Sequence, residues 1–140
     1  MVITRPARIF AAFVGAIALA LPGRSAMAEP VCEPIVRIAE LDIDPAQLDT
    51  YKALLSEEIE AAVRLEPGVL SLNAVSVKGH PAQIRIVEIY ADKVAYEAHL
   101  MSPHFLKYKN STAAMVRSLR LVETDPILLR AKSPGAGRFM

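Results

Sequence analysis

The sequence lacks several features that identify common binding or catalytic sites. It has one cysteine, Cys32, among 140 residues, so an intramolecular disulfide and a CxxC pair are both excluded. Cys32 is expected to be an inert thiol or, alternatively, a link between two subunits. No glycine-rich phosphate loop and no HExxH helix is present, which argues against nucleotide binding and zinc-protease chemistry. The 16 basic and 15 acidic residues form no basic stripe, so we expect no nucleic-acid partner.

The N-terminal segment has the pattern of a secretory signal peptide. Arg5 and Arg8 precede an uncharged apolar stretch over 9–21, and Ala26 and Ala28 occupy the positions that a signal peptidase reads. This stretch is shorter than the roughly 20 residues that span a bilayer. We therefore predict a signal peptide over residues 1–28 that is cleaved after Ala28. The protein would then be exported, periplasmic in a Gram-negative source, and without a stable membrane anchor; an uncleaved anchor is the alternative.

The remaining sequence predicts one domain over 29–131 and a mobile tail over 132–140, because its length does not allow two ordinary cores. Alternating apolar residues predict strands, and apolar residues at three- and four-residue steps predict helices. Asp44 and Pro45 are suited to begin the first helix. We predict strands over 35–43, 69–77, 83–91 and 119–129, a turn over 78–82, a helix over 45–66, and a helix over 92–117 that is interrupted at Ser102-Pro103.

This order of elements, βαββαβ, is typical of the ferredoxin-like α+β fold, in which two helices cover one face of a four-stranded antiparallel sheet. The first and third predicted strands carry apolar residues on both faces. On the first strand Ile38 and Leu41 point to opposite faces, and on the third Ile86 and Val87 do. Two helices can cover only one of these faces. We therefore predict a homodimer that packs sheet on sheet, as in a dimeric α+β barrel.

Residues 88–108, EIYADKVAYEAHLMSPHFLKY, bring together two histidines, three tyrosines and a strand carboxylate. This segment resembles the antibiotic biosynthesis monooxygenase (ABM) family, in which Glu-x-aromatic at a strand end precedes His-Leu-x-Ser/Thr-Pro-His-Phe-x-x-Tyr on a helix. The resemblance extends over about residues 35–129. The positions that carry it are Glu88, Tyr90, His99, Leu100, Ser102, Pro103, His104, Phe105 and Tyr108.

The resemblance implies a choice among quinol monooxygenases, polyketide-tailoring oxygenases, haem-degrading enzymes and an isomerase. Haem degradation is disfavoured because Ala39-Glu40-Leu41 has no asparagine, Tyr90 stands in place of a tryptophan, and Lys109 lies near the expected axial histidine. The absence of tryptophan also weakens the match to the polyketide-tailoring members. We therefore predict a small cofactor-independent monooxygenase, with no metal, that oxidises a quinol or similar electron-rich aromatic with dioxygen.

Such chemistry needs a base, donors for an oxyanion and a dry pocket. His99 or His104 is the candidate base, and Tyr90 and Tyr108 are candidate oxyanion donors. Each also has a structural interpretation, as a histidine bonded to a carboxylate or a packed tyrosine with a wet hydroxyl. The candidate substrate-binding residues are Glu88, Asn73, Leu100, Met101 and Phe105; among these, Glu88 equally suits a structural pair, Met101 a core position and Asn73 a cross-strand hydrogen bond.

Two other functions fit the same residues. The histidines are suited to acid–base isomerisation of a small carbonyl compound, although no cationic cluster beside the motif favours a phosphate-bearing substrate. The domain is also suited to bind a ligand without turning it over. Dependence on oxygen distinguishes the monooxygenase from both alternatives.

Overall fold

A computed structural model describes residues 33–132 of the chain. The predicted signal peptide, Cys32 and residues 133–140 of the predicted tail lie outside the described residues. The elements are β1 (Ile35–Ile43), the 3-10 turn η1 (Pro45–Gln47), α1 (Leu48–Leu65), β2 (Val69–Val77), β3 (His80–Tyr90), α2 (Lys93–Leu100), α3 (Pro103–Thr112) and β4 (Val116–Thr124). Within residues 33–132, no helix has the length and apolar character needed to cross a membrane.

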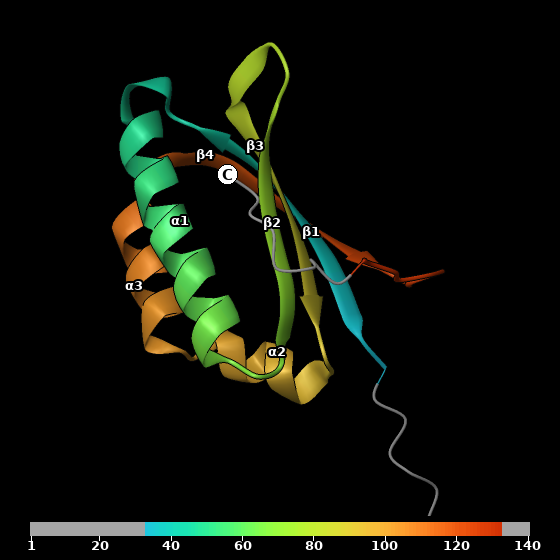
Figure 1. Ribbon diagram of the computed structural model, residues 1–140. Helices are drawn as coiled ribbons and strands as arrows, with labels where there is room; N and C mark the ends of the chain where they lie inside the picture. The colour runs from blue at the N-terminus through green and yellow to red at the C-terminus, as the bar shows by residue number, and fades with distance from the viewer. Residues whose placement is uncertain (1–32, 133–140) are drawn as a thin grey trace, which may run out of the picture.

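The four strands form one antiparallel sheet in the order β2-β3-β1-β4. Helices α1 and α3 pack beside each other over one face, and α2 lies at one end of the sheet (Figure 1). This arrangement confirms the predicted ferredoxin-like fold.

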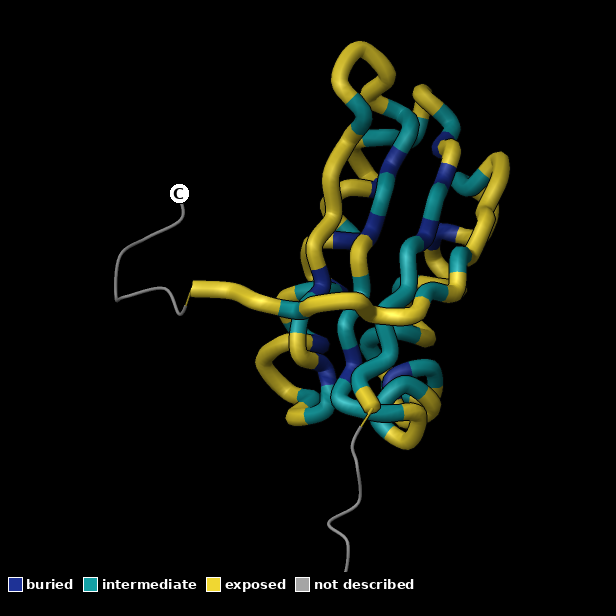
Figure 2. The backbone as a smooth tube through the Cα atoms, turned by 90° about the vertical axis from the view of Figure 1, so that its right-hand side faces the viewer, coloured by how far each residue is buried: buried dark blue, intermediate teal, exposed yellow. Residues whose placement is uncertain are grey.

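The face of the sheet that meets the helices is apolar and buried. Ala39 lies opposite Ile86 and Leu41 lies opposite Ile84 across β1 and β3, and all four contribute to the core. Figure 2 shows the buried positions inside this layer and exposed backbone around it. The alternation places Val87, 36% exposed, on the outer face. Coverage of that outer face by a second copy stays a prediction.

Two boundaries near the C-terminus differ from the predictions. Helix α3 ends at Thr112 instead of continuing to 117, and β4 spans Val116–Thr124 instead of 119–129. The sequence between these elements has no glycine or proline, so nothing local marks the change. The change is fixed by pairing, because Val116 lies opposite Ile43 of β1, and Pro126, which lacks a backbone donor, follows the end of the strand.

The hairpin between β2 and β3 is tighter than predicted. The turn consists of Lys78 and Gly79, whereas a turn over 78–82 was expected. Gly79 has a φ of 82°, a conformation that glycine adopts without steric cost. The start of α1 also differs, because Asp44 caps the short turn η1 through the backbone N–H of Ala46, and α1 itself begins at Leu48.

Candidate functional site

Three helix ends meet at one end of the sheet and define the surroundings of the predicted motif. Helix α1 ends before Glu66-Pro67, and the side chains of Asp92 and Ser102 cap α2 and α3. The loop after α1 approaches α2 closely at Gly68, where an added Cβ would lie 2.3 Å from the Cβ of Ala95. Only a residue without a side chain fits there, so Gly68 allows the end of α1 to lie next to α2.

Four side chains, one from within α1 and three from these helix ends, form what we call the carboxylate–imidazole cluster: Glu58, Glu66, His99 and His104. Glu66 Oε1 lies 2.9 Å from His99 Nδ1 and 2.5 Å from His104 Nε2. His99 Nε2 lies 3.6 Å from Glu58 Oε1. Because an ionised carboxylate only accepts hydrogen bonds, both imidazoles donate to Glu66, and each neutral ring keeps its other nitrogen as an acceptor.

The two histidines differ in their access to solvent. The side chain of His99 is 4% exposed, whereas that of His104 is 17% exposed. His104 and Glu66 line an open cavity of about 560 Å³ together with Pro67, Gly68 and Ala98. A molecule in this cavity would therefore meet His104 first.

Burial changes the acidity of the carboxyl groups. Glu58 is 5% exposed, and burial together with the charges of Glu88 and Glu66 raises the pKa of Glu58 to about 7. Burial also raises the pKa of Glu88, against the lowering effects of the Tyr90 hydroxyl, which donates to it at 3.0 Å, and of His99 and Arg37. Glu58 therefore holds a proton to a higher pH than an exposed glutamate does.

Aromatic rings connect the cluster to the core. The His99 ring centroid lies 4.8 Å from that of Phe105 and 5.3 Å from that of Tyr90. Farther along, the hydroxyls of Tyr108 and Tyr51 are 2.7 Å apart. Burial raises the pKa of all three tyrosines, so they are neutral hydroxyls that can donate hydrogen bonds.

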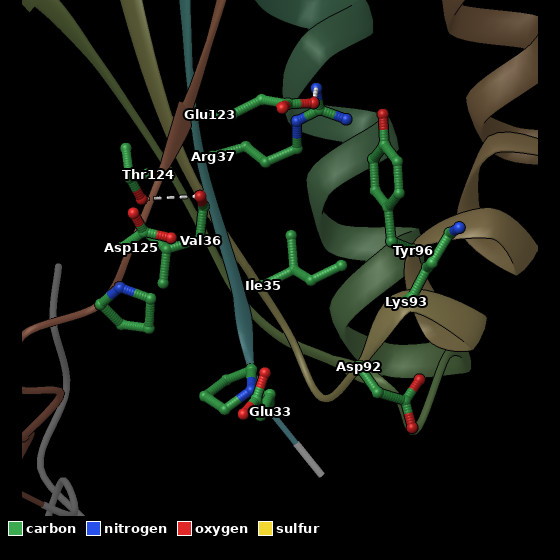
Figure 3. Close-up of a pocket in the computed structure, with 12 residues that line it drawn as sticks. Glu33, Ile35, Val36, Arg37, Asp92, Lys93, Tyr96, Glu123, Thr124 and Asp125 are labelled. Atoms are coloured by element: carbon green, nitrogen blue, oxygen red, sulfur yellow. Dashed lines mark hydrogen bonds and ion pairs between the residues drawn. The ribbon is translucent and has the colours of Figure 1, made fainter.

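A larger cavity of about 1040 Å³ lies between the start of β1 and the start of α2 (Figure 3). Arg37 and Tyr96 line it, and the Arg37 guanidinium lies 4.6 Å from the centroid of the Tyr96 ring. None of the nine candidate residues lines this cavity. Arg37 nevertheless links it to the site, because Arg37 lies opposite Glu88 in the sheet.

The structure brings most candidate residues together. One connected group of hydrogen bonds and ring contacts includes six of them: His99, His104, Tyr90, Glu88, Phe105 and Tyr108. Leu100 is half-buried at the end of α2, and Met101 is 73% exposed. Asn73 lies opposite Val87, on the outer face of the sheet, and donates to Ser71 Oγ at 2.6 Å. Neither Met101 nor Asn73 is placed with the cluster in this structure.

Glu58 and Glu66 were missed by the sequence interpretation. Glu58 follows Leu55 by three residues and precedes Ala62 by four, so it lies on the apolar face of α1, where a carboxylate is unusual. Glu66 was noted only as part of a helix end. The carboxylate of Glu58 on an apolar helix face was the available indication, but the residue that it faces, His99, lies on another helix.

Comparison with known proteins identifies related sequences and structures. The sequence pattern of the family described as antibiotic biosynthesis monooxygenase matches residues 34–111. A solved structure from Bacteroides thetaiotaomicron, described as a proposed antibiotic biosynthesis monooxygenase, is 47% identical with a TM-score of 0.70, over 71% of this chain and 97% of that one.

More distant structures share the fold. Proteins of the same description from Nitrosomonas europaea and Caulobacter crescentus are each 18% identical, with TM-scores of 0.64 and 0.65. The matches cover 68% and 69% of this chain and 91% and 92% of theirs. Comparison with curated proteins gave no match.

Proposed function

The chain belongs to the antibiotic biosynthesis monooxygenase family, as the motif over residues 88–108 predicted, and on this premise we propose that it is a monooxygenase. Its proposed substrate is a quinol or a similarly electron-rich aromatic, and its oxidant is dioxygen. The observation that carries the proposal is that His104 lines a cavity while it is held by Glu66. A base oriented by a carboxylate and open to a cavity suits the removal of a phenolic proton.

The proposed reaction begins with proton transfer from a phenolic hydroxyl to the free ring nitrogen of His104. Glu66 holds the opposite nitrogen and stabilises the imidazolium that forms. The resulting anion gives an electron to dioxygen, and the two radicals combine to form a hydroperoxide on a ring carbon once a proton is returned. The O–O bond of this hydroperoxide then breaks with loss of water, which leaves one oxygen atom on the ring as a carbonyl. One quinol and one dioxygen yield one hydroxyquinone and one water, so the substrate supplies all the electrons.

The remaining groups have supporting roles in this proposal. Phe105 packs between His99 and Tyr108 and keeps this side of the site apolar. Tyr90 and Tyr108 are the proposed donors for a developing oxyanion, since both are neutral hydroxyls. Tyr90 already donates to Glu88, so it would have to exchange that partner for the substrate.

Export and dimerisation are part of the proposal. The pattern over residues 1–28 supports export, and apolar residues on the outer face of the sheet, such as Ile38 and Val87, support a homodimer. Mass spectrometry of the secreted protein would test cleavage after Ala28. Sedimentation of the wild type against Val87→Asp would test the dimer, because a carboxylate at the centre of that face should yield monomers.

Oxygen consumption tests the activity. The purified protein is incubated with a panel of reduced quinols in the presence of EDTA, and autoxidation is subtracted. We expect stoichiometric uptake, and we expect His104→Ala to lower kcat/KM by about 10²- to 10⁴-fold. His80→Ala is the matched control, because His80 is exposed in the β2–β3 hairpin.

The outcome also distinguishes the alternatives. No uptake above autoxidation across the panel contradicts the monooxygenase. Turnover of a small carbonyl compound that continues without oxygen would instead indicate an isomerase that uses the same base. Binding of aromatics without turnover, unaffected by His104→Ala, would indicate a binding module.

A further inference from the structure

We propose that the carboxylate–imidazole cluster binds one divalent transition-metal ion through Glu58, His99 and His104. One ligand atom from each residue lies within 4.8 Å of the others. Zinc bonds to nitrogen and oxygen are about 2.0–2.2 Å long, so ligand atoms around one ion lie within about 4 Å of each other. Small side-chain rotations would close the site. Three protein ligands of this kind leave a fourth position for water.

The surroundings of the Glu58 carboxyl group favour a bound ion at this position. Its Oε1 atom is buried and has no hydrogen-bond partner among the described residues. A buried carboxylate without a hydrogen bond is costly, because it has lost water without gaining another partner. The same atom is the one that faces His99 Nε2 at 3.6 Å, a separation too long for a hydrogen bond. An ion between these two atoms would satisfy both.

Glu66 orients His99 as a metal ligand. Each imidazole donates one ring N–H to Glu66 Oε1, which leaves the other ring nitrogen free of a proton. For His99 the free nitrogen is Nε2, the atom that faces Glu58. A carboxylate that accepts from the outer nitrogen of a metal-bound histidine is a recurring arrangement in metal sites. The geometry therefore assigns Glu66 as a positioning residue.

The balance of charge also favours a cation. Glu58, Glu66 and Glu88 converge on His99, and no lysine takes part in the hydrogen bonds or ion pairs of this group among the described residues. Arg37 acts on Glu88, but its guanidinium is already bonded to Glu123 at 2.9 Å. A divalent ion would offset the negative charge that these carboxyl groups carry when they are ionised.

The donor set indicates which ions fit. Two imidazoles and one carboxylate suit Zn²⁺, Co²⁺ or Fe²⁺, whereas Mg²⁺ and Ca²⁺ prefer oxygen ligands alone. A metal-bound imidazole no longer accepts a proton. The metal-bound state and the base-competent state of the cluster would therefore exclude each other, and binding is an additional property of the site beside the proposed oxygenation.

Metal uptake by the purified full-length protein tests this proposal without any substrate. The protein is stripped with EDTA, dialysed against Zn²⁺ or Co²⁺, and analysed for metal per chain and for visible absorption of Co²⁺. We expect one ion per chain and Co²⁺ bands of a four-coordinate site. Glu58→Gln and His104→Ala should each weaken binding by at least about tenfold, and Glu66→Gln by about 10- to 100-fold.

Two control variants separate a built site from surface binding. Glu60 lies two residues after Glu58 on α1 and is exposed, and His80 is exposed in the hairpin. Glu60→Gln and His80→Ala should leave the affinity unchanged. Thermal melting confirms that each variant is folded. Because wild-type Co²⁺ absorption needs no variant, the proposal remains testable even if a ligand substitution unfolds the chain.

Either of two results would overturn the proposal. The first is wild-type uptake below one ion per chain with only the spectrum of hydrated Co²⁺. The second is equal affinity in the wild type, Glu58→Gln and His104→Ala. Neither result bears on oxygen uptake, which is measured in EDTA, so the failure of one proposal does not imply the failure of the other.

Discussion

The layer between the helices and the sheet has two ends with opposite chemistry. At one end, Ile43, Leu55 and Ile84 are buried in an apolar cluster that also contains the paired hydroxyls of Tyr51 and Tyr108. At the other end, Glu58 and His99 are buried to a similar extent, beside Tyr90. The same helix α1 contributes to both ends. The apolar end supplies stability, and this stability offsets the cost of burying ionisable groups at the other end.

Truncation of a side chain at the apolar end should have the largest effect on the free energy of unfolding. Leu55→Ala removes a side chain that is 5% exposed and leaves a cavity, so it should lower the free energy of unfolding by about 2–5 kcal/mol. Urea denaturation measures the change. Val94→Ala is the control, because Val94 is 73% exposed and its truncation should cost under about 0.5 kcal/mol. Equal losses in the two variants would contradict the assignment of the core.

At the polar end, replacing a buried ionisable group with a neutral one should raise the free energy of unfolding instead of lowering it. The folded-state pKa of Glu58, about 7, lies above its usual value of 4.5, so the folded protein holds this proton more tightly than the unfolded chain does. The contribution to stability is present below about pH 4.5 and is lost as the pH rises through 7.

Glu58→Gln should therefore raise stability relative to the wild type between pH 5 and 8, by on the order of 1–3 kcal/mol. Melting in EDTA across this pH range measures the difference. Glu60→Gln, at an exposed position on the same helix, should show no such trend. A wild-type minus Glu58→Gln difference that does not change with pH would contradict the inferred acidity of Glu58.

The close approach between the ends of α1 and α2 should be sensitive to one methyl group. Gly68→Ala forces the loop and α2 apart, because the new Cβ would lie 2.3 Å from that of Ala95. We expect a loss of about 1–3 kcal/mol in denaturation, with a weaker hydrogen bond between His99 and Glu66 in NMR spectra of the imidazole N–H. The double variant Gly68→Ala, Ala95→Gly should recover part of the loss; no recovery would contradict a direct clash.

The smallest effect is expected where a polar contact enters the apolar end. Tyr51→Phe removes one of two hydroxyls that are 2.7 Å apart and leaves that of Tyr108 without its partner. The expected cost is about 1 kcal/mol in denaturation, because the rings still fill the space. Tyr108→Phe should cost a similar amount, and the double variant less than the sum. Additive losses would show that the two hydroxyls do not interact.

Local sequence was sufficient for most elements of the fold. The alternation over 35–43 and 69–77 predicted β1 and β2 with their observed bounds, and Pro67 and Pro103 marked where α1 ends and α3 begins. The limits of α3 and β4 were wrong because no local residue decides them and they depend on pairing with β1. The hairpin turn is set locally, by the positive φ of Gly79, and the prediction made it too long.

The sequence by itself determined the fold class, the family and the residues of the motif, because periodicity, capping residues and motif spacing are local properties of the chain. Only the tertiary structure decided that Glu58 and Glu66 complete the site and that Asn73 lies on the other face of the sheet. The physical reason is distance along the chain: Glu66 meets His99 and His104 across 33 and 38 residues. Hydrogen bonds between such residues depend on how α1, α2 and α3 pack, which no local pattern specifies.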